Sequence, residues 1–388
     1  MPSDVDVAIV GGGVIGTSIA YHLACRDAID IALFERDQLG SGTTSKAAGG
    51  VRNVFSHPMN VEVGMHSLAF YRRFGDETGV DLDVEETGYL YLVHDETERR
   101  EWADRRDQLR AHDVETQLID ADAIAERFPP IDPEMVEGGF FAPKCLHLDP
   151  YTVTQGFATA ARERGAKIRT GTPVESVNVS GETVTSVTTS EEMVETEYVI
   201  NAAGPWGVDL AASVGLDLPI TRSARRIAVT EPVADASSPL LIDRDRRCYF
   251  RTEANGSMLL CDLDGDVDDI TDPTAARGQD VDLDYQFDAL SKVSELVPDV
   301  AEVGVINGWT GVQTHTPDGH PILGPTEIDG FQLASGFNGL GVMLAPTLGR
   351  AFAEHIVDGS TDMIDLDRLS PDRFERPPED RIEPERLA

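Results

Sequence analysis

The chain has few positively charged residues and very little lysine. Of its 388 residues, 32 are Lys or Arg and 69 are Asp or Glu, which gives a net charge of −37. The acidic residues are spread along the whole chain, and lysine occurs only at Lys46, Lys144, Lys167 and Lys292. Self-repulsion of this size destabilises a compact protein at low ionic strength and is screened by salt. We therefore expect a halophile's protein adapted to a very salty cytoplasm, with an ordinary acidic protein as the alternative. The charge argues against nucleic acid or an anionic membrane as the main partner.

Long apolar runs and clustered cysteines are also missing. No stretch reaches the ~18 apolar residues of a membrane span, so no transmembrane segment is expected. The first residues run directly into a strand pattern without a basic segment followed by an apolar one, so we expect a cytoplasmic protein. The four cysteines are scattered, with no C-x-x-C and no histidine cluster at metal spacing. We expect free thiols and no metal site.

A glycine-rich turn joins a strand and a helix near the N-terminus. The β-branched run 6–10 is typical of a buried strand, and Gly11, Gly13 and Gly16 follow it as G-x-G-x-x-G before a helical pattern over 14–25. These glycines permit the tight turn, the approach of a pyrophosphate and close packing of the helix. A second strand, 29–34, ends at Glu35, whose carboxylate can accept hydrogen bonds from a ribose. The unit indicates a dinucleotide site and leaves FAD and NAD both open.

Three later segments favour FAD. Residues 40–50 are small and polar with four glycines, so this loop can lie flat against a large planar ring. A strand over 195–201 runs into Ala202-Ala-Gly-Pro-Trp206, which suits a second close approach to the cofactor. A strand over 331–335 and the turn 336–341 precede a helix predicted over 346–357, whose dipole can point at a flavin ring.

The rest of the chain is assigned coarsely. Helices are predicted over 60–75, 96–112, 120–128, 150–164 and 287–296, and extended segments over 82–93, 138–148, 167–170, 173–179, 184–189, 225–231, 247–252 and 257–261. Residues 262–284 are interpreted as an acidic loop. The Pro-, Arg- and acid-rich segment after Thr361 is expected to be poorly ordered or draped on the surface.

Taken together and in order, several motifs resemble the D-amino-acid-oxidase-like FAD-dependent oxidoreductases, closest to the sarcosine oxidase β-subunit and L-proline dehydrogenase β-subunit type. The matching segments are 8–16, 42–52, 198–206, 316–324 and 334–341. The resemblance implies an α/β fold, with an FAD-binding Rossmann-like domain interleaved with an α+β substrate domain on a mixed, largely antiparallel sheet. We expect the FAD-binding domain in 1–80, 145–215 and 306–360, the substrate domain in 81–144 and 216–305, and a C-terminal tail in 361–388.

The resemblance also implies the cofactor contacts. Thr43 and Thr44 would lie near the pyrophosphate, Val174 near the adenine, and Gly311 beside the isoalloxazine. With the glycine turn, the predicted cofactor-binding residues are Gly11, Gly13, Val14, Ile15, Gly16, Glu35, Arg36, Thr43, Thr44, Ser45, Lys46, Ala48, Gly49, Gly50, Val174, Ala203, Gly204, Trp206, Gly311, Gly336, Asn338, Gly339, Leu340, Gly341 and Val342. Relatives with covalent flavin carry Cys or His where this chain has Gly311 and, approximately, Lys46, so non-covalent FAD is expected.

The substrate side departs from the resembling enzymes. Their carboxylate-binding positions hold Gln313 and Met343, and no lysine stands near Met258, where the oxidases have an oxygen-activating lysine. This favours a dehydrogenase with an acceptor other than oxygen. Arg52 and Arg251 are candidates to bind a substrate carboxylate and Tyr249 to hydrogen-bond the substrate; His315 and His320 are weaker candidates.

The predicted function is oxidation of the C–N bond of a small amine or amino acid by hydride transfer to flavin N5. Sarcosine, dimethylglycine, proline, glycine and D-amino acids all stay open as substrates, as do the electron acceptor and a homo- or hetero-oligomer. The alternatives are an FAD-bearing subunit of a larger electron-transfer complex and a non-catalytic FAD-binding assembly factor.

Overall fold

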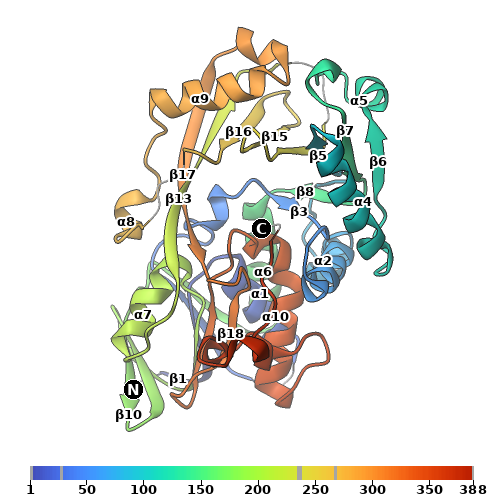
Figure 1. Ribbon diagram of the computed structural model, residues 1–388. Helices are drawn as coiled ribbons and strands as arrows, with labels where there is room; N and C mark the ends of the chain where they lie inside the picture. Colours follow the sequence, from blue (N-terminus) through green and yellow to red (C-terminus); the bar gives the residue numbers. More distant parts are fainter. Residues whose placement is uncertain (1–2, 27–28, 234–237, 266–268, 387–388) are drawn as a thin grey trace.

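Two large β-sheets form the framework of the computed structural model, which describes residues 3–26, 29–233, 238–265 and 269–386. The first sheet lies in the lower half of Figure 1 and has eight strands, in which β10-β11-β12-β1-β2-β9 follow one another and β19 joins β12 to β18. Its strands are β1 (Ser3–Val10), β2 (Ile31–Glu35), β9 (Lys167–Thr170), β10 (Val174–Ser180), β11 (Thr183–Thr189), β12 (Met193–Asn201), β18 (Ile322–Pro325) and β19 (Phe331–Ser335). Parallel pairing of β9, β2, β1, β12 and β19 gives it a Rossmann-like centre.

The second sheet crosses the top of the molecule in the order β17-β13-β16-β15-β14-β5-β7-β6. Its strands are β5 (Tyr89–Val93), β6 (Gln117–Asp120), β7 (Gly138–Ala142), β13 (Thr221–Thr230), β14 (Leu240–Asp243), β15 (Cys248–Thr252), β16 (Met258–Asp262) and β17 (Val305–His315). Only the β14–β5 pair is parallel among these neighbours. The expected combination of a Rossmann-like part with a mixed, largely antiparallel sheet is therefore confirmed.

The antiparallel ribbon of β13 and β17 connects the two halves. The strands pair from Thr221↔His315 to Thr230↔Val305, with Arg225 opposite Gly311. The two strands form one edge of the second sheet, and the lower end of the ribbon reaches toward the first sheet (Figure 1). The domain limits stay a prediction. Strand β17 begins beside the proposed limit at residue 306, where the FAD-binding domain was expected to resume, and it belongs to the second sheet.

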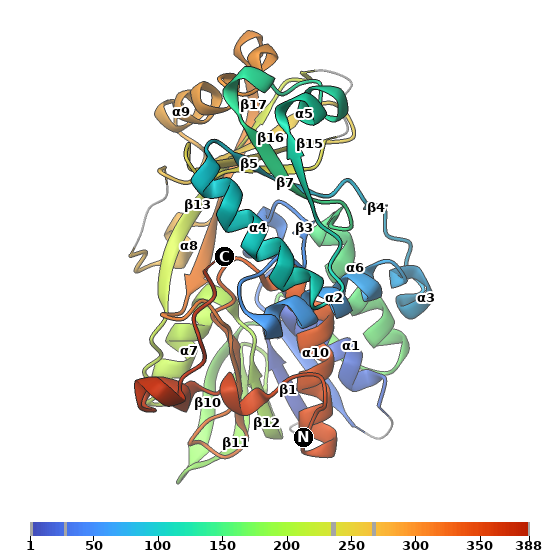
Figure 2. The same cartoon turned by 45° about the vertical axis from the view of Figure 1, so that its right-hand side comes forward.

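Helices cover the first sheet and pack against both faces of the second. The α-helices are α1 (Val14–Ala24), α2 (Pro58–Tyr71), α3 (Phe74–Thr78), α4 (Glu96–Arg110), α5 (Ala121–Arg127), α6 (Pro150–Glu163), α7 (Gly207–Ser213), α8 (Pro273–Ala276), α9 (Leu283–Ser294) and α10 (Gly341–Asp358). Figure 2 shows α1, α6, α10 and α2 grouped together, and one large apolar cluster runs through these four helices. A short sheet of β3 (Gly50–Val51), β8 (Leu146–Leu148) and β4 (Val84–Glu85) lies beside them.

Close contact between α1 and α10 explains one wrong prediction. The C-terminal helix begins at Gly341 rather than at Pro346, which lies inside it. The Ser18 hydroxyl donates to the carbonyl oxygen of Ala345 at 2.8 Å, and a Cβ on Gly349 would come within 2.3 Å of the Ser18 hydroxyl. These contacts hold the segment helical across a proline that would otherwise mark a helix start.

Two further assignments are corrected. The stretch 262–284 was predicted to be a loop, but it contains α8 and the start of α9, each capped by an aspartate side chain, Asp272 and Asp282. The long strand β17 was not predicted, because glycines interrupt its apolar pattern. None of the helices within the described residues has the length and apolar character needed to cross a bilayer.

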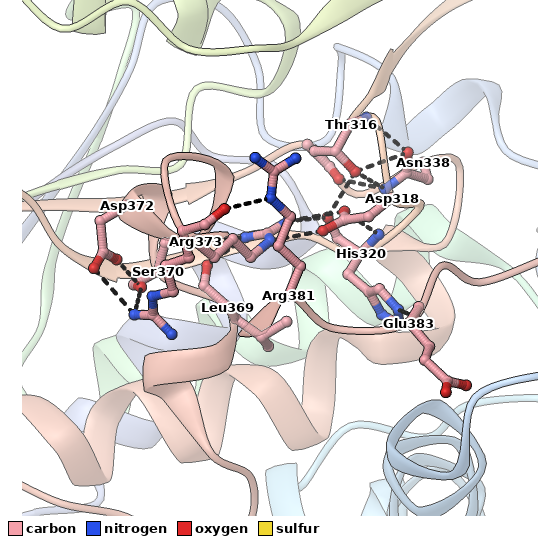
Figure 3. A network of polar contacts seen from close by, with 12 residues as sticks. Thr316, Asp318, His320, Asn338, Leu369, Ser370, Asp372, Arg373, Arg381 and Glu383 are labelled. Atoms are coloured by element: carbon pink, nitrogen blue, oxygen red, sulfur yellow. Dashed lines mark hydrogen bonds and ion pairs between the residues drawn. The ribbon is translucent and has the colours of Figure 1, made fainter. Parts of the chain in front are cut away.

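The segment after Thr361 was predicted to be poorly ordered or draped on the surface, and most of its described residues are exposed or half-buried, while a few buried side chains fasten it to the rest of the protein. Arg373 is 1% exposed and makes a two-pronged contact with Asp318, Nε to Oδ2 at 2.8 Å and Nη2 to Oδ1 at 3.0 Å. Figure 3 shows this contact continuing through His320 and Thr316 to Asn338, whose Oδ1 accepts from Thr316 N at 2.9 Å. The tail therefore supports the turn 336–341.

The end of the tail is also anchored. The buried Glu385 carboxylate accepts hydrogen bonds from the Ser56 amide and hydroxyl, the His57 amide and the Asn60 side chain at 2.6–3.1 Å. These donors surround the start of α2, where unpaired amides and the helix dipole favour a negative charge. The tail thus bridges the beginning of α2 and the Asp318 turn.

Candidate functional site

The glycine turn after β1 is packed against the end of β12. Gly11 has φ = 112°, and a Cβ there would come within 2.4 Å of the carbonyl oxygen of Ala202. A Cβ on Gly16 would lie 2.0 Å from the Gly11 carbonyl oxygen, so α1 starts directly against the turn. Side chains at these positions would separate the strand ends, which is the physical reason for glycine here.

Glu35 closes the end of β2. One carboxylate oxygen accepts from Gly12 N at 2.7 Å and the other from Asp37 N at 2.8 Å. The carboxylate is thus held beside the glycine turn. Next to it, the Arg36 guanidinium stacks on the ring of Trp206 at 3.8 Å.

The loop 40–50 lies between the two sheets. The Thr43 hydroxyl donates to the carbonyl oxygen of Val312 at 2.6 Å, and Trp309 Nε1 donates to that of Lys46 at 3.1 Å. A Cβ on Gly311 would meet the Lys46 Cβ at 2.7 Å, so glycine is required for this approach. The loop is therefore fastened to β17, as a loop lying between a cofactor and the second sheet would be.

A cavity opens between the sheets, and we call it the interface cavity. Predicted residues that line it are Gly11, Gly13, Val14, Ile15, Glu35, Arg36, Thr43, Thr44, Lys46, Val174, Ala203, Gly204, Trp206, Gly311, Gly339, Gly341 and Val342. Lining residues outside the predicted set of cofactor contacts are Val10, Phe34, Gly42, Ala47, Pro173, Ala202, Pro205, Leu210, Arg225, Arg277, Val312, Gln313, Thr314 and Phe337, of which Gly42, Ala47, Ala202, Pro205 and Phe337 lie within segments predicted to face the cofactor. Several of the missed residues flank a predicted one, so reading each motif outward by a residue would have found them; Arg225 and Arg277 had no such signal.

The other predicted cofactor residues do not line this cavity. They are Gly16, Ser45, Ala48, Gly49, Gly50, Gly336, Asn338 and Leu340. Gly49 and Gly50 pack elsewhere, because their Cβ atoms would strike the Leu148 carbonyl oxygen at 2.1 Å and the Tyr89 hydroxyl at 1.8 Å. Asn338 shapes the last glycine turn instead: it has φ = 53°, and its Nδ2 donates to the Gly336 carbonyl oxygen at 2.6 Å.

The charged residues that line the interface cavity are mostly cationic, although the protein as a whole is strongly acidic. Among its described lining residues, Arg36, Lys46, Arg225 and Arg277 are cationic and Glu35 is the one carboxylate, whereas the whole chain carries −37. Local cations in a cleft focus the field toward an anionic ligand. A dinucleotide, with a ribose for Glu35 and a pyrophosphate for the cations and the glycine turn, fits these residues.

Comparison with known proteins decides the family. The family model described as FAD dependent oxidoreductase (DAO) matches residues 6–355. The chain belongs to this family. It is 27% identical over 386 residues to human mitochondrial dimethylglycine dehydrogenase, covering 95% of this chain and 44% of that protein. It is 30% identical over 423 residues to FAD-dependent oxidoreductase domain-containing protein 1 of Xenopus laevis, covering 96% and 83%. It superimposes on L-proline dehydrogenase from P. horikoshii with a TM-score of 0.90 at 26% identity, covering 97% and 99%. The chain spans less than half the length of the dimethylglycine dehydrogenases it matches.

FAD is therefore the dinucleotide for which the interface cavity is built. Its described lining contains no cysteine and no histidine, the residues expected to carry covalent flavin in this family. Gly311 leaves only a backbone next to Lys46. The family and the lining agree with the prediction of non-covalent FAD.

The arginines predicted to bind substrate have different surroundings in this FAD-dependent fold. Arg52 is buried away from the cavity lining, where its Nη1 donates to the carbonyl oxygen of Val54 at 2.7 Å and to the Tyr91 hydroxyl at 2.9 Å. Arg251 lies on the second sheet, where its Nε donates to the Ala48 carbonyl oxygen at 2.9 Å and its Nη2 pairs with Glu253 at 2.7 Å. Arg251 therefore contacts the loop 40–50, which we call the flavin loop, but none of Arg52, Tyr249 and Arg251 lines the interface cavity.

Tyr249 lies in a small apolar cluster on the face of the second sheet that meets the flavin loop. The cluster contains Ile227, Leu259 and Cys261, with Ala48, Val229, Tyr249, Leu263 and Trp309 packed against it. Burial, reinforced by the neighbouring Cys261 thiol, raises the pKa of the Tyr249 phenol well above its usual value, so the phenol is neutral. Arg225 is the one of the three arginines on β13, the strand of Ile227, that lines the interface cavity, and its Nε donates to Gln313 Oε1 at 3.3 Å.

His315 and His320 do not line the cavity. The His315 ring nitrogen Nε2 lies 2.7 Å from the Ser223 hydroxyl, and His320 Nε2 lies 2.9 Å from the carbonyl oxygen of Glu383 in the tail. Both histidines thus serve contacts within the protein.

Proposed function

We propose that the chain oxidises the C–N bond of a small amino acid whose nitrogen is substituted, using non-covalent FAD and passing the electrons to an acceptor other than oxygen. Two relatives support this choice, since one is named a dimethylglycine dehydrogenase and another an L-proline dehydrogenase. Both names describe dehydrogenases of an amino acid with a substituted nitrogen. The observation that carries the proposal is an apolar sheet face with arginines at its edge, set against the flavin loop.

The chain's own residues would bind and orient this substrate. FAD, when bound, supplies the acceptor for a hydride from the carbon beside the nitrogen. The apolar cluster around Ile227 and Leu259 would exclude water and favour the neutral amine, which is the reactive form. The nitrogen lone pair forms the C=N bond as the hydride leaves, and water hydrolyses the released imine.

Arg225 is the cation we assign to the substrate carboxylate, in place of Arg52. It lines the interface cavity directly beside Gly311. Arg52 does not line the cavity, and its guanidinium donates hydrogen bonds to the Val54 carbonyl oxygen and the Tyr91 hydroxyl. Arg251 is the second candidate because it contacts the flavin loop through Ala48. A guanidinium can hold a carboxylate with two charge-assisted hydrogen bonds.

The assignment as a dehydrogenase rests on Leu259. This apolar, buried residue occupies the region where an oxygen-activating lysine is expected in oxidases of the resembling type. A fixed cation there would stabilise superoxide formed from the reduced cofactor. Without it, transfer to oxygen is expected to be slow.

Anaerobic loss of the visible flavin absorbance in concentrated KCl tests the proposal. Sarcosine, dimethylglycine, L-proline, glycine and D-alanine form the panel, and dimethylamine and pyrrolidine are the matched compounds without a carboxylate. We expect rapid bleaching by at least one N-substituted amino acid and slow recovery when air is admitted. Bleaching by glycine or D-alanine alone, or fast peroxide release, would refute the corresponding part of the proposal.

Substitution of the arginines tests the carboxylate assignment. We expect Arg225→Met to raise KM for the best substrate about ten- to hundredfold, because the variant loses the charged hydrogen bonds to the substrate carboxylate. Oxidation of pyrrolidine, which has no carboxylate, should be unchanged. Arg52→Met is expected to lower stability without this selectivity. Equal effects of Arg225→Met on the two compounds would remove Arg225 from the site.

A second candidate function is that of an FAD-bearing subunit of a larger electron-transfer complex. Leu283 and Phe287 lie one turn apart on α9 and are 79% and 71% exposed. Large apolar side chains grouped on one helix face are typical of subunit contacts. Association of the purified protein, detected by light scattering, would favour this candidate over a stand-alone enzyme. Bleaching of the flavin by substrate without electron transfer to a soluble dye acceptor would favour it as well.

A further inference from the structure

The segment 270–278, which we call the strap, crosses from the second sheet to the end of β2. It begins with Ile270 N donating to the Arg222 carbonyl oxygen at 3.0 Å and ends with Gly278 N donating to that of Thr310 at 3.1 Å. Both acceptors belong to the β13–β17 ribbon. Figure 1 shows α8, the short helix within the strap, beside β13 and above α7. The strap is thus fixed at both ends to one half of the protein.

The middle of the strap contacts the other half. Thr274 accepts a hydrogen bond from Trp206 Nε1 at 2.9 Å, and Arg277 Nη1 pairs with Asp37 at 2.8 Å. Trp206 follows β12 and Asp37 follows β2, so both partners stand at strand ends of the first sheet. The Arg277 guanidinium also lies 5.8 Å from the Trp206 ring centroid, within cation–π distance.

These contacts lie at one defined end of the interface cavity. Arg277, Arg36 and Trp206 line it, and Asp37 is two residues beyond Glu35. In a dinucleotide fold the acid at the end of the second strand binds the ribose of the adenosine half. The flavin loop and Gly311 lie toward the other half, so the strap faces the adenosine half of FAD.

Charge gives the strap a specific ligand chemistry. Arg36 and Arg277 approach the same indole ring, at 3.8 Å and 5.8 Å. Mutual repulsion of two guanidinium groups is unfavourable, and burial together with this repulsion lowers the pKa of Arg36, with Asp37 and Glu35 opposing the change. An anionic dinucleotide placed between these cations would relieve the repulsion.

We propose that the strap closes over the adenosine half of FAD, that Arg277 and Thr274 are cofactor-retaining residues, and that FAD is released only when their contacts with Asp37 and Trp206 open. The strap belongs to the half of the protein that contains the second sheet. Retention of the cofactor therefore depends on the two halves staying together. Retention of FAD by the strap does not involve a substrate, so it can be tested separately from the proposed reaction.

The test measures FAD release from the holoprotein by the rise in flavin fluorescence after dilution, at the lowest KCl concentration that keeps the protein folded. Arg277→Ala removes the ion pair and the cation–π contact, and we expect release about tenfold faster. Thr274→Val removes the acceptor for Trp206 at equal size and is expected to accelerate release severalfold. Arg277→Lys, which keeps the charge, should restore most of the retention.

Arg247→Ala is the matched control, because Arg247 forms an exposed ion pair with Asp264 on the same half of the protein and does not line the cavity. The apoproteins are then titrated with FAD and with FMN, which lacks the adenosine. Arg277→Ala should weaken FAD binding and leave FMN binding within twofold of the unsubstituted protein. Unchanged FAD release, or equal weakening of FAD and FMN, would overturn the proposal. If Arg277→Ala does not fold, Thr274→Val and Arg277→Lys decide the same question.

Discussion

Replacing Arg373 by alanine removes the centre of the tail network. The side chain is 1% exposed and donates to both oxygens of Asp318 and to the carbonyl oxygens of Leu369 and His320 at 2.7–3.0 Å. The alanine variant leaves a largely buried carboxylate without its cation. Breaking a buried pair in this way costs about 3–5 kcal/mol of unfolding free energy. With a urea m-value of about 3 kcal/mol/M, the unfolding midpoint should fall by roughly 1–1.7 M.

Arg376→Ala is the matched control in the same segment. Arg376 pairs with Asp372 in an exposed contact at 3.0 Å, so its removal should cost no more than about 1 kcal/mol. Urea unfolding of both variants, followed by tryptophan fluorescence in the same KCl buffer, makes the comparison. If the two variants lose equal stability, the reasoning about the buried pair is refuted.

Acid unfolding gives an independent check on the same pair. Burial raises the pKa of Asp318, but the hydrogen bonds and charge of Arg373 outweigh it and hold the pKa below its usual value. The pair therefore contributes stability that is complete above the unfolded pKa of about 3.9 and is lost as the pH falls through the folded value. The Arg373→Ala variant should lose this part of the acid dependence.

Three other outcomes are expected. Gly16→Ala places a Cβ 2.0 Å from the Gly11 carbonyl oxygen and should yield protein without visible flavin absorbance, whereas Gly75→Ala, whose Cβ would rest 3.7 Å from Asp81 outside the cavity lining, should keep FAD; retention of FAD by both would contradict the packing argument. The hydrogen bond to Asp243 raises the pKa of His94, so its stabilisation is complete below the unfolded pKa of about 6.5 and is lost as the pH rises through the folded value; an NMR midpoint at or below that of a free histidine would be inconsistent with it. The melting temperature should rise with KCl from millimolar to molar concentrations, because salt screens the net charge of −37; a flat response would argue against the halophile interpretation.

The sequence predicts well wherever a feature depends on near neighbours. The strand, glycine turn and helix around Gly11 and Gly16 follow from spacing and backbone geometry alone, and β19 occupies the predicted range 331–335. The same local logic brought Glu35 and Trp206 to the interface cavity. The family resemblance extended these assignments to Val174 and to Gly311.

Features that depend on distant partners could not be predicted. Arg52 was proposed for the site because it follows the flavin loop in sequence, and its hydrogen bond with Tyr91 is a contact that no local pattern shows. Arg277 lies in an acidic stretch with no motif, and only the fold of the strap brings it to Asp37. The order of the tail likewise depends on Asp318, a partner that no local pattern identifies.

The position of β1 has a consequence for biosynthesis. This strand is made long before β12, one of its two neighbours in the first sheet, and the two pair from Ser3↔Val194 to Val10↔Asn201. A nascent chain therefore carries an unpaired apolar strand edge until residue 201 has left the ribosome, and β19 adds to β12 only after residue 335. Unpaired edges invite association with other chains, and long-range pairing folds slowly. Translation that stalls before residue 201 should leave an aggregation-prone chain that depends on chaperones.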